Sequence, residues 1–118
     1  GDIIFEYDDD KNSKNVRDHG ISFKTAARVF FDYYRIEMFD EDNSIDEDRY
    51  NVIGDLSVGY NNYIRVEYES VRNSDDIVFV VYTERFVMNT HGKRMSVIRL
   101  ISARYATNFE RGLYYGKY

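Results

Sequence analysis

The amino-acid sequence predicts an α+β fold in which two N-terminal helices and a C-terminal helix pack on an antiparallel β-sheet. Apolar residues at helical spacing occupy the first third of the chain, and β-branched and aromatic runs fill the rest up to a helix-capping pattern near the end. With 118 residues, the chain is expected to form a single domain over residues 1–118.

The N-terminal third is expected to form a strand followed by two helices. Residues 3–7 are apolar and aromatic, and the acidic run after them places carboxylates where a helix N-terminus favours them. The first helix should run from about Lys11 to His19 and end at Gly20, since glycine suits the left-handed position just past a helix. Ser22 caps the second helix, whose apolar residues recur along one face.

The rest of the chain is expected to form the sheet and the last helix. Strands are predicted at residues 36–39, 49–56, 63–68, 77–83 and 95–103, with 49–56 and 63–68 joined as a hairpin. The run 77–83 is almost continuously apolar, which is typical of a central strand covered on both faces. Residues 40–48, of which six are acidic, should form a solvated loop, and residues 86–94 a connection. Thr107 and Glu110 fit the capping box of the C-terminal helix.

Charge is distributed unevenly along the chain, although the net charge is −5. Residues 1–84 carry 9 Lys and Arg against 20 Asp and Glu, whereas residues 85–118 carry 7 Lys and Arg and only one acid. A basic segment beside an acidic remainder can hold a polyanion such as RNA on one face. Alternatively, the charges mix on the folded surface.

The composition excludes several classes of protein. The chain has no cysteine, which excludes a disulfide scaffold, a thiolate metal site and a cysteine nucleophile. Its two histidines lie 72 positions apart, without a metal-ligand spacing, and there is no phosphate-binding glycine loop, so we expect neither a metal nor a cofactor. The longest apolar run is too short to span a bilayer, and nothing indicates export, so we expect a soluble, cytoplasmic protein without a membrane partner.

Charged residues near the predicted C-terminal strands are the main candidates for chemistry. Glu84 and Arg85 follow the central strand, while Arg99 interrupts an apolar run, where a guanidinium is rarely buried without a partner. Arg99 either pairs structurally with Glu84 or another acid, or clamps a scissile phosphate together with Arg104. Strict strand alternation places these two arginines on opposite faces, so they share one site only if the strand bulges near Ser102.

Histidine and tyrosine supply further candidates. His19 could act as a general acid or base, although its place before Gly20 favours a structural role at a helix end. His91 is expected to be a turn residue. Some of the 12 tyrosines could stack on bases, while most should cover the core. The tyrosines near the candidate arginines are Tyr82, Tyr105, Tyr114 and Tyr115.

Four stretches of the sequence carry a family resemblance. They are Phe5-Glu6-Tyr7-Asp8, His19-Gly20-Ile21-Ser22-Phe23, Val80-Val81-Tyr82-Thr83-Glu84-Arg85, and Ile98-Arg99-Leu100-Ile101-Ser102-Ala103-Arg104 followed by Thr107, Glu110-Arg111 and Tyr114. In this order, these stretches resemble the BrnT family of type II toxin–antitoxin toxins over nearly the whole chain.

The resemblance implies a RelE-like fold and a metal-independent endoribonuclease that inhibits growth by cleaving RNA. It also implies a cognate antitoxin with a ribbon-helix-helix DNA-binding domain, through which alone the toxin meets operator DNA. The charged signature of the family falls on five positions, which are His19, Glu84, Arg85, Arg99 and Arg104. Three further side chains are expected to contact the RNA substrate, namely Tyr82, Arg94 and Arg111.

The chain also departs from the family pattern. Tyr7 stands where the family usually has tryptophan, Asp9 replaces a common proline, and Asp18 occupies a position that is usually basic. Added acidic residues weaken attraction to RNA. The alternative hypothesis is therefore a catalytically inactive, BrnT-like protein-binding module.

Overall fold

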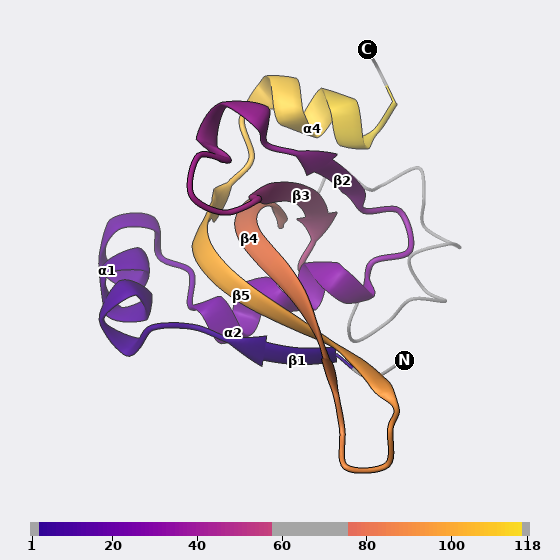
Figure 1. Ribbon diagram of the computed structural model, residues 1–118. Helices are drawn as coiled ribbons and strands as arrows, with labels where there is room; N and C mark the ends of the chain where they lie inside the picture. Colours follow the sequence, from indigo (N-terminus) through magenta and orange to yellow (C-terminus); the bar gives the residue numbers. More distant parts are fainter. Residues whose placement is uncertain (1–2, 58–75, 117–118) are drawn as a thin grey trace.

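The computed structural model describes residues 3–57 and 76–116 of the chain. Within these ranges, helices pack around a five-stranded sheet with strand order β1-β5-β4-β3-β2 (Figure 1). The strands are β1 (Ile3–Glu6), β2 (Ile36–Phe39), β3 (Tyr50–Asp55), β4 (Ile77–Met88) and β5 (Arg94–Tyr105). The helices are α1 (Asp9–His19), α2 (Phe23–Ala26) and α4 (Asn108–Tyr114), with 3-10 turns η1 (Ala27–Phe31) and η2 (Glu41–Asn43). The predicted α+β class is confirmed.

The sheet is mixed, so the prediction of an antiparallel sheet was wrong. The β2–β3, β3–β4 and β4–β5 pairings are antiparallel. Strand β1, however, runs parallel to β5, with Ile3 beside Ser96 and Glu6 beside Arg99. A short hairpin connection forces neighbouring strands to be antiparallel. Most of the chain separates β1 from β5, so no such connection dictates their direction.

Local capping patterns place the helix ends. The Asp8 carboxylate accepts a hydrogen bond of 2.8 Å from the backbone N–H of Asp10, so α1 begins at Asp9, slightly before the predicted start. At the other end, Gly20 has a φ of 73° and donates its N–H to the carbonyl of Val16, as predicted for a helix stop. Ser22 caps α2, although the helix tightens after only one turn into the 3-10 turn η1.

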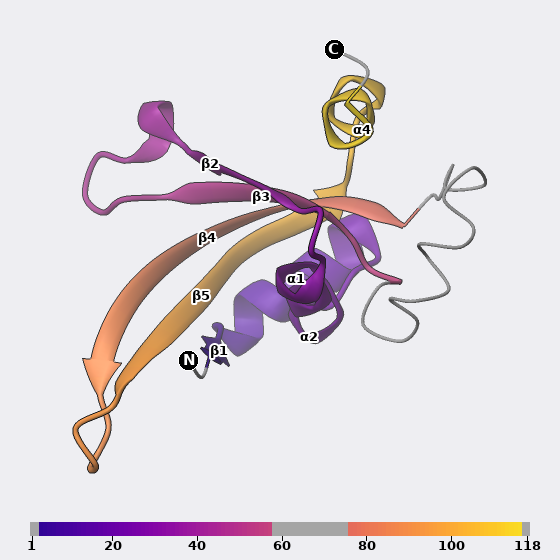
Figure 2. The same ribbon diagram turned by 90° about the vertical axis from the view of Figure 1, so that its right-hand side faces the viewer.

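The larger core lies on the face of the sheet that α2 and η1 cover (Figure 2). Apolar side chains of α2 and η1, including Phe23, Val29 and Phe30, meet buried residues of the central strands there. At Gly54 a Cβ atom would lie 2.8 Å from the Cβ of Val29, which explains why β3 carries glycine at this contact.

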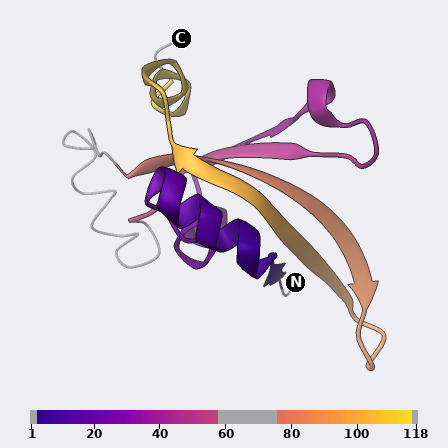
Figure 3. The same cartoon turned by 90° about the vertical axis from the view of Figure 1, so that its left-hand side faces the viewer.

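Helix α1 lies beside β5, beyond the point where β1 ends (Figure 3). The buried amide of Asn15 donates to the Ala103 carbonyl at 2.8 Å and accepts from the Ala103 N–H at 3.0 Å. Because β1 pairs with β5 only as far as Arg99, this amide supplies the hydrogen bonds that another strand would make. It also donates to the carbonyl of Ile21 and so connects α1 to the chain that enters α2.

A smaller core lies under α4, on the opposite face of the sheet (Figure 2). Ile53, Ile77 and Tyr114 form its buried centre. The Tyr114 hydroxyl donates to the buried carboxylate of Asp32 at 2.6 Å, and the same carboxylate oxygen accepts from the N–H of Asp55 at 2.9 Å. Asp32 therefore joins the end of η1 to both β3 and α4.

The hairpin of β4 and β5 is longer than the sequence predicted, because residues 86–88 and Arg94 belong to the strands instead of the connection. The turn is tightened by Asn89, whose side-chain oxygen accepts from the N–H groups of His91 and Lys93 at 2.9 Å. His91 is thus a turn residue, as predicted. The predicted strand at 63–68 lies outside the described residues. Among the helices of the described residues, none is long and apolar enough to cross a membrane.

The link between Tyr114 and Asp32 can be tested by removing one hydroxyl group. Tyr114→Phe should lower the free energy of unfolding by roughly 1.5–3 kcal/mol, the contribution typical of a hydrogen bond to a charged group. Urea unfolding measures the difference. Tyr33→Phe is the control, since Tyr33 is 87% exposed. Equal stabilities of the two variants would contradict this role for Asp32.

Candidate functional site

One extra residue interrupts the alternation of β5. Val81 lies opposite Ser102 in the β4–β5 ladder, but the next residue, Tyr82, lies opposite Leu100. Ile101 is therefore unpaired, and β5 carries a β-bulge at the place where the sequence analysis required one. As a result, Arg99 and Arg104, whose side chains would point to opposite faces of a regular strand, share one face.

The bulge brings the candidate arginines to one face of the β4–β5 hairpin. Arg99 lies opposite Thr83 of β4. Arg104 lies opposite Phe79, which comes four residues before Thr83 on β4. Since alternate residues of a strand share a face, both arginines lie on the side that also bears Arg85. We call this surface the arginine face, and it is the face opposite to the one that packs on α2.

Each of these arginines is paired with a glutamate. Arg85 donates to both carboxylate oxygens of Glu6, and Arg99 contacts the two oxygens of Glu47 at 2.7 and 3.0 Å. The side chains of Arg85 and Arg99 are 57% and 44% exposed, and ion pairs this exposed to solvent add little to stability. Another anion, such as a phosphate group, can therefore replace the carboxylates at little cost.

Arg85, Arg99 and Glu6 lie near one another on the arginine face. Glu6 lies directly beside Arg99 in the parallel β1–β5 pair and accepts its hydrogen bonds from Arg85. The hydrogen bond from Arg85 lowers the pKa of Glu6, desolvation opposes the shift, and the charges of Arg85 and Arg99 reinforce it. Arg104 stands about 15 Å further along β5 at the usual rise per residue. Arg99 and Arg104 are therefore too far apart to clamp one phosphate together, although both can contact one RNA strand.

Arg104 is held between β5 and α4. Its guanidinium donates to the two oxygens of Glu110 at 2.7 and 2.9 Å and lies 4.3 Å from the ring centre of Phe79. Glu110 also completes the predicted capping box with Thr107. Partial burial raises the pKa of Glu110, but the hydrogen bonds from Arg104 and from the Thr107 backbone outweigh it, so the pKa is lowered.

Glu84 and His19, the two members of the family's charged signature that are not arginines, lie apart from the arginine face. Glu84 lies opposite Ile98, on the other face of the hairpin, and accepts a hydrogen bond from the Ser96 hydroxyl. It therefore does not pair with Arg99, whose acid is Glu47. His19 is the exposed last residue of α1, and no hydrogen bond or ion pair between described residues joins it to the arginine face. In the described ranges, no three His, Cys, Asp or Glu side chains gather so that they could hold a metal ion.

The three predicted RNA contacts have different surroundings. Tyr82 is only 3% exposed and packs against Phe30, at 4.8 Å between ring centres, so its ring is not accessible to a base in this conformation. Its aromatic ring extends the apolar core. Arg94 lies over the ring of Phe86 at 3.7 Å, near the hairpin turn and on the face opposite to the arginine face. Arg111 lines a pocket beside α4.

Three arginines, each paired with a glutamate, line one face of the sheet, and such a face is a candidate contact surface for a polyanion. A family model described as "Ribonuclease toxin, BrnT, of type II toxin-antitoxin system" matches residues 7–110. The chain therefore belongs to the BrnT family of ribonuclease toxins, and the resemblance seen in the sequence is confirmed. A comparison with curated proteins found no match.

Sequence reasoning missed the acids that complete this site. Glu6 belongs to one of the stretches that carry the family resemblance, but its place beside Arg99 depends on the parallel pairing of β1. Glu47 lies in the acidic segment that was expected to be solvated, and no local pattern distinguishes it from the neighbouring acids.

The Arg104–Glu110 pair predicts a pH-dependent stability. Glu110→Gln should lower the free energy of unfolding at neutral pH by about 1 kcal/mol. Because folding depresses the pKa of Glu110, its contribution is present above the ordinary value of 4.5 and is lost as the pH falls through the folded value. Urea unfolding across this range should show the difference from the parent shrinking on acidification.

Glu41→Gln is the matched control for that experiment, because Glu41 is an exposed acid of η2. This variant should show little change at any pH. A deficit in Glu110→Gln that stays constant down to acid pH would contradict an ionic contribution of Glu110.

Proposed function

We propose that the chain is a metal-independent endoribonuclease toxin that binds and cuts RNA on its arginine face. The observation that carries this proposal is the grouping of Arg85 and Arg99 around Glu6, with Arg104 further along the same face. Two guanidinium groups on one face, each near Glu6, can hold one phosphate through charge-assisted hydrogen bonds. Arg104 would then hold a neighbouring part of the RNA backbone.

RNA supplies its own nucleophile, which is the 2′-hydroxyl group of the ribose. Its attack on the adjacent phosphorus forms a pentavalent, negatively charged intermediate, and the bond to the 5′ oxygen of the next nucleotide then breaks. Arg85 and Arg99 would stabilise the added charge, a role that preorganised cations perform well. The departing 5′ oxygen would take a proton from water, so the products would be a 2′,3′-cyclic phosphate and a 5′-hydroxyl group.

Glu6 is the proposed proton acceptor for the 2′-hydroxyl group. In the free protein, its hydrogen bond from Arg85 lowers its pKa and makes it a weak base. A phosphate that takes over the guanidinium of Arg85 removes this hydrogen bond and adds a negative charge nearby, and both changes raise the pKa of Glu6. Binding of substrate would thereby activate the base. Glu84 and His19, the other members of the family's charged signature, lie away from the arginines.

Membership of a type II toxin–antitoxin family supports the rest of the proposal. We infer a cognate antitoxin that neutralises the toxin and carries a ribbon-helix-helix domain, so that operator DNA is bound only through the antitoxin. A RelE-like fold and a cytoplasmic location are part of the same inference.

The central test is RNA cleavage in the presence of EDTA by antitoxin-free protein. The parent should cut, and Arg99→Ala should cut at least about 100-fold more slowly, the usual effect of removing one group that stabilises a developing negative charge. Primer extension on total cellular RNA locates the cuts. Arg17→Ala is the matched control, since Arg17 is an exposed arginine of α1, and it should cut like the parent.

If the folded parent cuts neither free RNA nor RNA on translating ribosomes, the proposal fails. The alternative, a catalytically inactive protein-binding module, would then account for the acids that neutralise the arginines. Loss of cutting only when EDTA is present would reject metal independence alone.

Glu47 competes with RNA for Arg99 in this account. Glu47→Gln should therefore raise the affinity for RNA by about 2- to 5-fold, as expected from freeing one exposed ion pair. An oligonucleotide with 2′-O-methyl riboses can be used for the binding measurement, because it lacks the attacking hydroxyl group. Asp46→Asn removes the same charge from the same segment, and an equal gain in that variant would show that only net charge matters.

A further inference from the structure

Strand β1 is available for pairing along one side. It is the outermost strand of the sheet, and among the described residues no strand pairs with the side that faces away from β5 (Figure 1). Backbone N–H and C=O groups of alternate residues point outwards from such an edge, where they can pair with another chain. The chain contains no proline, a residue that often prevents this pairing. Strand β1 can therefore accept an added strand from a partner.

An apolar groove lies between β1 and the segment formed by α2 and η1. Ile3, Phe5 and Tyr7 alternate along the chain, so their side chains share one face. This is the face that α2 covers, since the rings of Phe5 and Phe30, and those of Tyr7 and Phe23, lie 5.5 Å apart between centres. The lining residues that α2 and η1 supply are Phe23, Lys24, Ala27, Arg28 and Phe31.

The floor of the groove is packed, whereas its rim is exposed. Phe23 and Ala27 are buried in the larger core, but Ile3 and Phe31 are 40% and 57% exposed. Apolar side chains that line a groove and remain in contact with water are typical of an interaction site, because their burial is favourable. Apolar side chains of a partner could cover Ile3 and Phe31 without any change in the core.

The charged residues of the groove are both cationic. Lys24 is exposed and forms no ion pair with another described residue. Arg28, about one turn further along, adds a second positive charge, and the described residues that line the groove include no acid. Charge complementarity therefore favours a partner segment that carries an acidic side chain among apolar ones.

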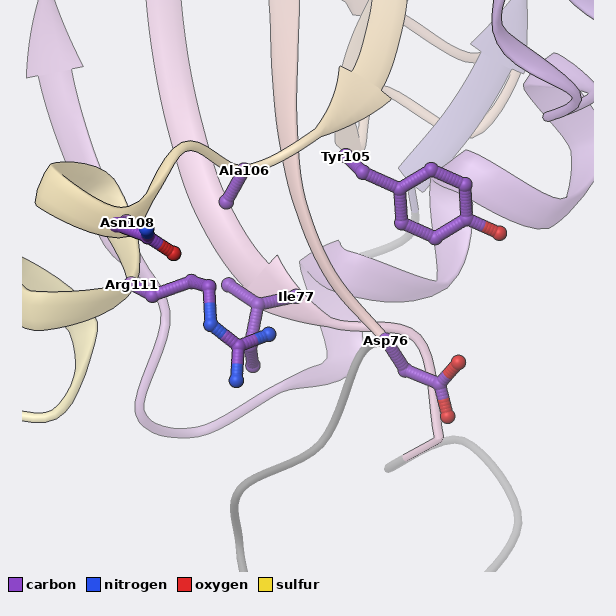
Figure 4. A pocket seen from close by; sticks show the side chains of 6 residues that line it. All are labelled: Asp76, Ile77, Tyr105, Ala106, Asn108 and Arg111. Carbon is purple, nitrogen blue, oxygen red and sulfur yellow. The ribbon is translucent and has the colours of Figure 1, made fainter.

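The pocket beside α4 is different, because its polar side chains do not converge. Figure 4 shows Tyr105 and Asp76 directed away from Arg111. Asp76 and Arg111 also already interact with other groups. The groove beside β1 combines an apolar lining, cations and a strand edge, so it is the better docking surface.

We propose that the groove and the outer edge of β1 bind an extended segment of the cognate antitoxin. The segment pairs with β1 as a further strand, places alternate apolar side chains in the groove and brings an acidic side chain to Lys24. The proposal rests on the proposed function, because membership of a type II toxin–antitoxin family supplies the partner.

Docking at this edge also reaches the arginine face. Glu6 points to the face of β1 opposite to Phe5, because neighbouring residues of a strand alternate. The side chains of the added strand alternate in the same way, so those that do not enter the groove lie beside Glu6 and its partner Arg85. The antitoxin thus competes with RNA for the arginine face while the groove holds it in place.

Hydrogen exchange of the full chain, alone and in complex, locates the docking surface. The probe is the antitoxin protein encoded beside the gene of this chain, purified separately and added in excess. Alternate backbone amides of residues 3–7 should exchange at least about tenfold more slowly in the complex, because pairing with the added strand protects them. Protection confined to residues outside 3–7 and 23–31 would overturn the proposal.

Two charge substitutions test the contacts in the groove. Phe31→Glu should weaken the complex at least about tenfold, because it places a carboxylate on an apolar contact. Lys24→Glu should weaken it about 3- to 10-fold, because it repels the acidic side chain of the antitoxin. The controls are Ile45→Glu, at a residue that is 85% exposed between β2 and β3, and Lys14→Glu, at an exposed lysine of α1. Both should bind like the parent in calorimetric titrations, and urea unfolding checks that every variant is folded.

RNA cleavage separates failure of this surface from failure of the proposed function. Phe31→Glu should cut RNA like the parent but resist inhibition by the antitoxin, because Phe31 lies on the face opposite to the arginines. If the parent cuts RNA and both groove variants bind the antitoxin like the parent, the ribonuclease stands and the docking surface is overturned. If the parent cuts nothing but Phe31→Glu loses the antitoxin, the surface stands and the ribonuclease fails. Dimers of the parent that Phe31→Glu dissociates would assign the groove to a second copy of the chain and would also overturn the proposal.

Discussion

The arrangement of this protein depends on how β4 and β5 pair around a single extra residue. Before Ile101, alternate residues such as Leu100 face the larger core, and after it Ala103 does so, although the two differ in parity. Without the bulge, burial of both would be incompatible, or Arg104 would enter the core at the high cost of an unpaired buried guanidinium. The same extra residue therefore completes the core and gathers the arginines outside it.

The parts of the fold that were predictable are those determined by neighbouring residues. The stop at Gly20, the cap at Ser22 and the capping box at Thr107 each depend on three or four residues, and all are present. The direction of β1 and the length of the β4–β5 hairpin depend on partners far along the chain. A four-residue strand and an exposed polar hairpin carry no pattern that identifies such partners.

The candidate site divides in the same way. The arginines stood out because charged residues interrupt an otherwise apolar strand. The sequence showed that Arg99 and Arg104 could share a face only if β5 contained a bulge, but it did not show that the bulge exists. Their partners Glu6 and Glu47 come from an edge strand and an acidic segment, and only the tertiary structure selects them. Glu84 was misleading because sequence proximity to Arg85 places it on the opposite face of the strand. An acidic chain can thus carry on one face a row of arginines whose charges are held in ion pairs with glutamates.

The central claim is that RNA lies on the arginine face with its scissile phosphate between Arg85 and Arg99. The most direct measurement is a crystal structure of the protein with an RNA oligonucleotide that carries 2′-O-methyl riboses. The account predicts a phosphate bound to both guanidinium groups, with Glu6 released from Arg85 and lying next to the 2′ oxygen. RNA bound around His19 and Glu84, with the arginine–glutamate pairs intact, would contradict it.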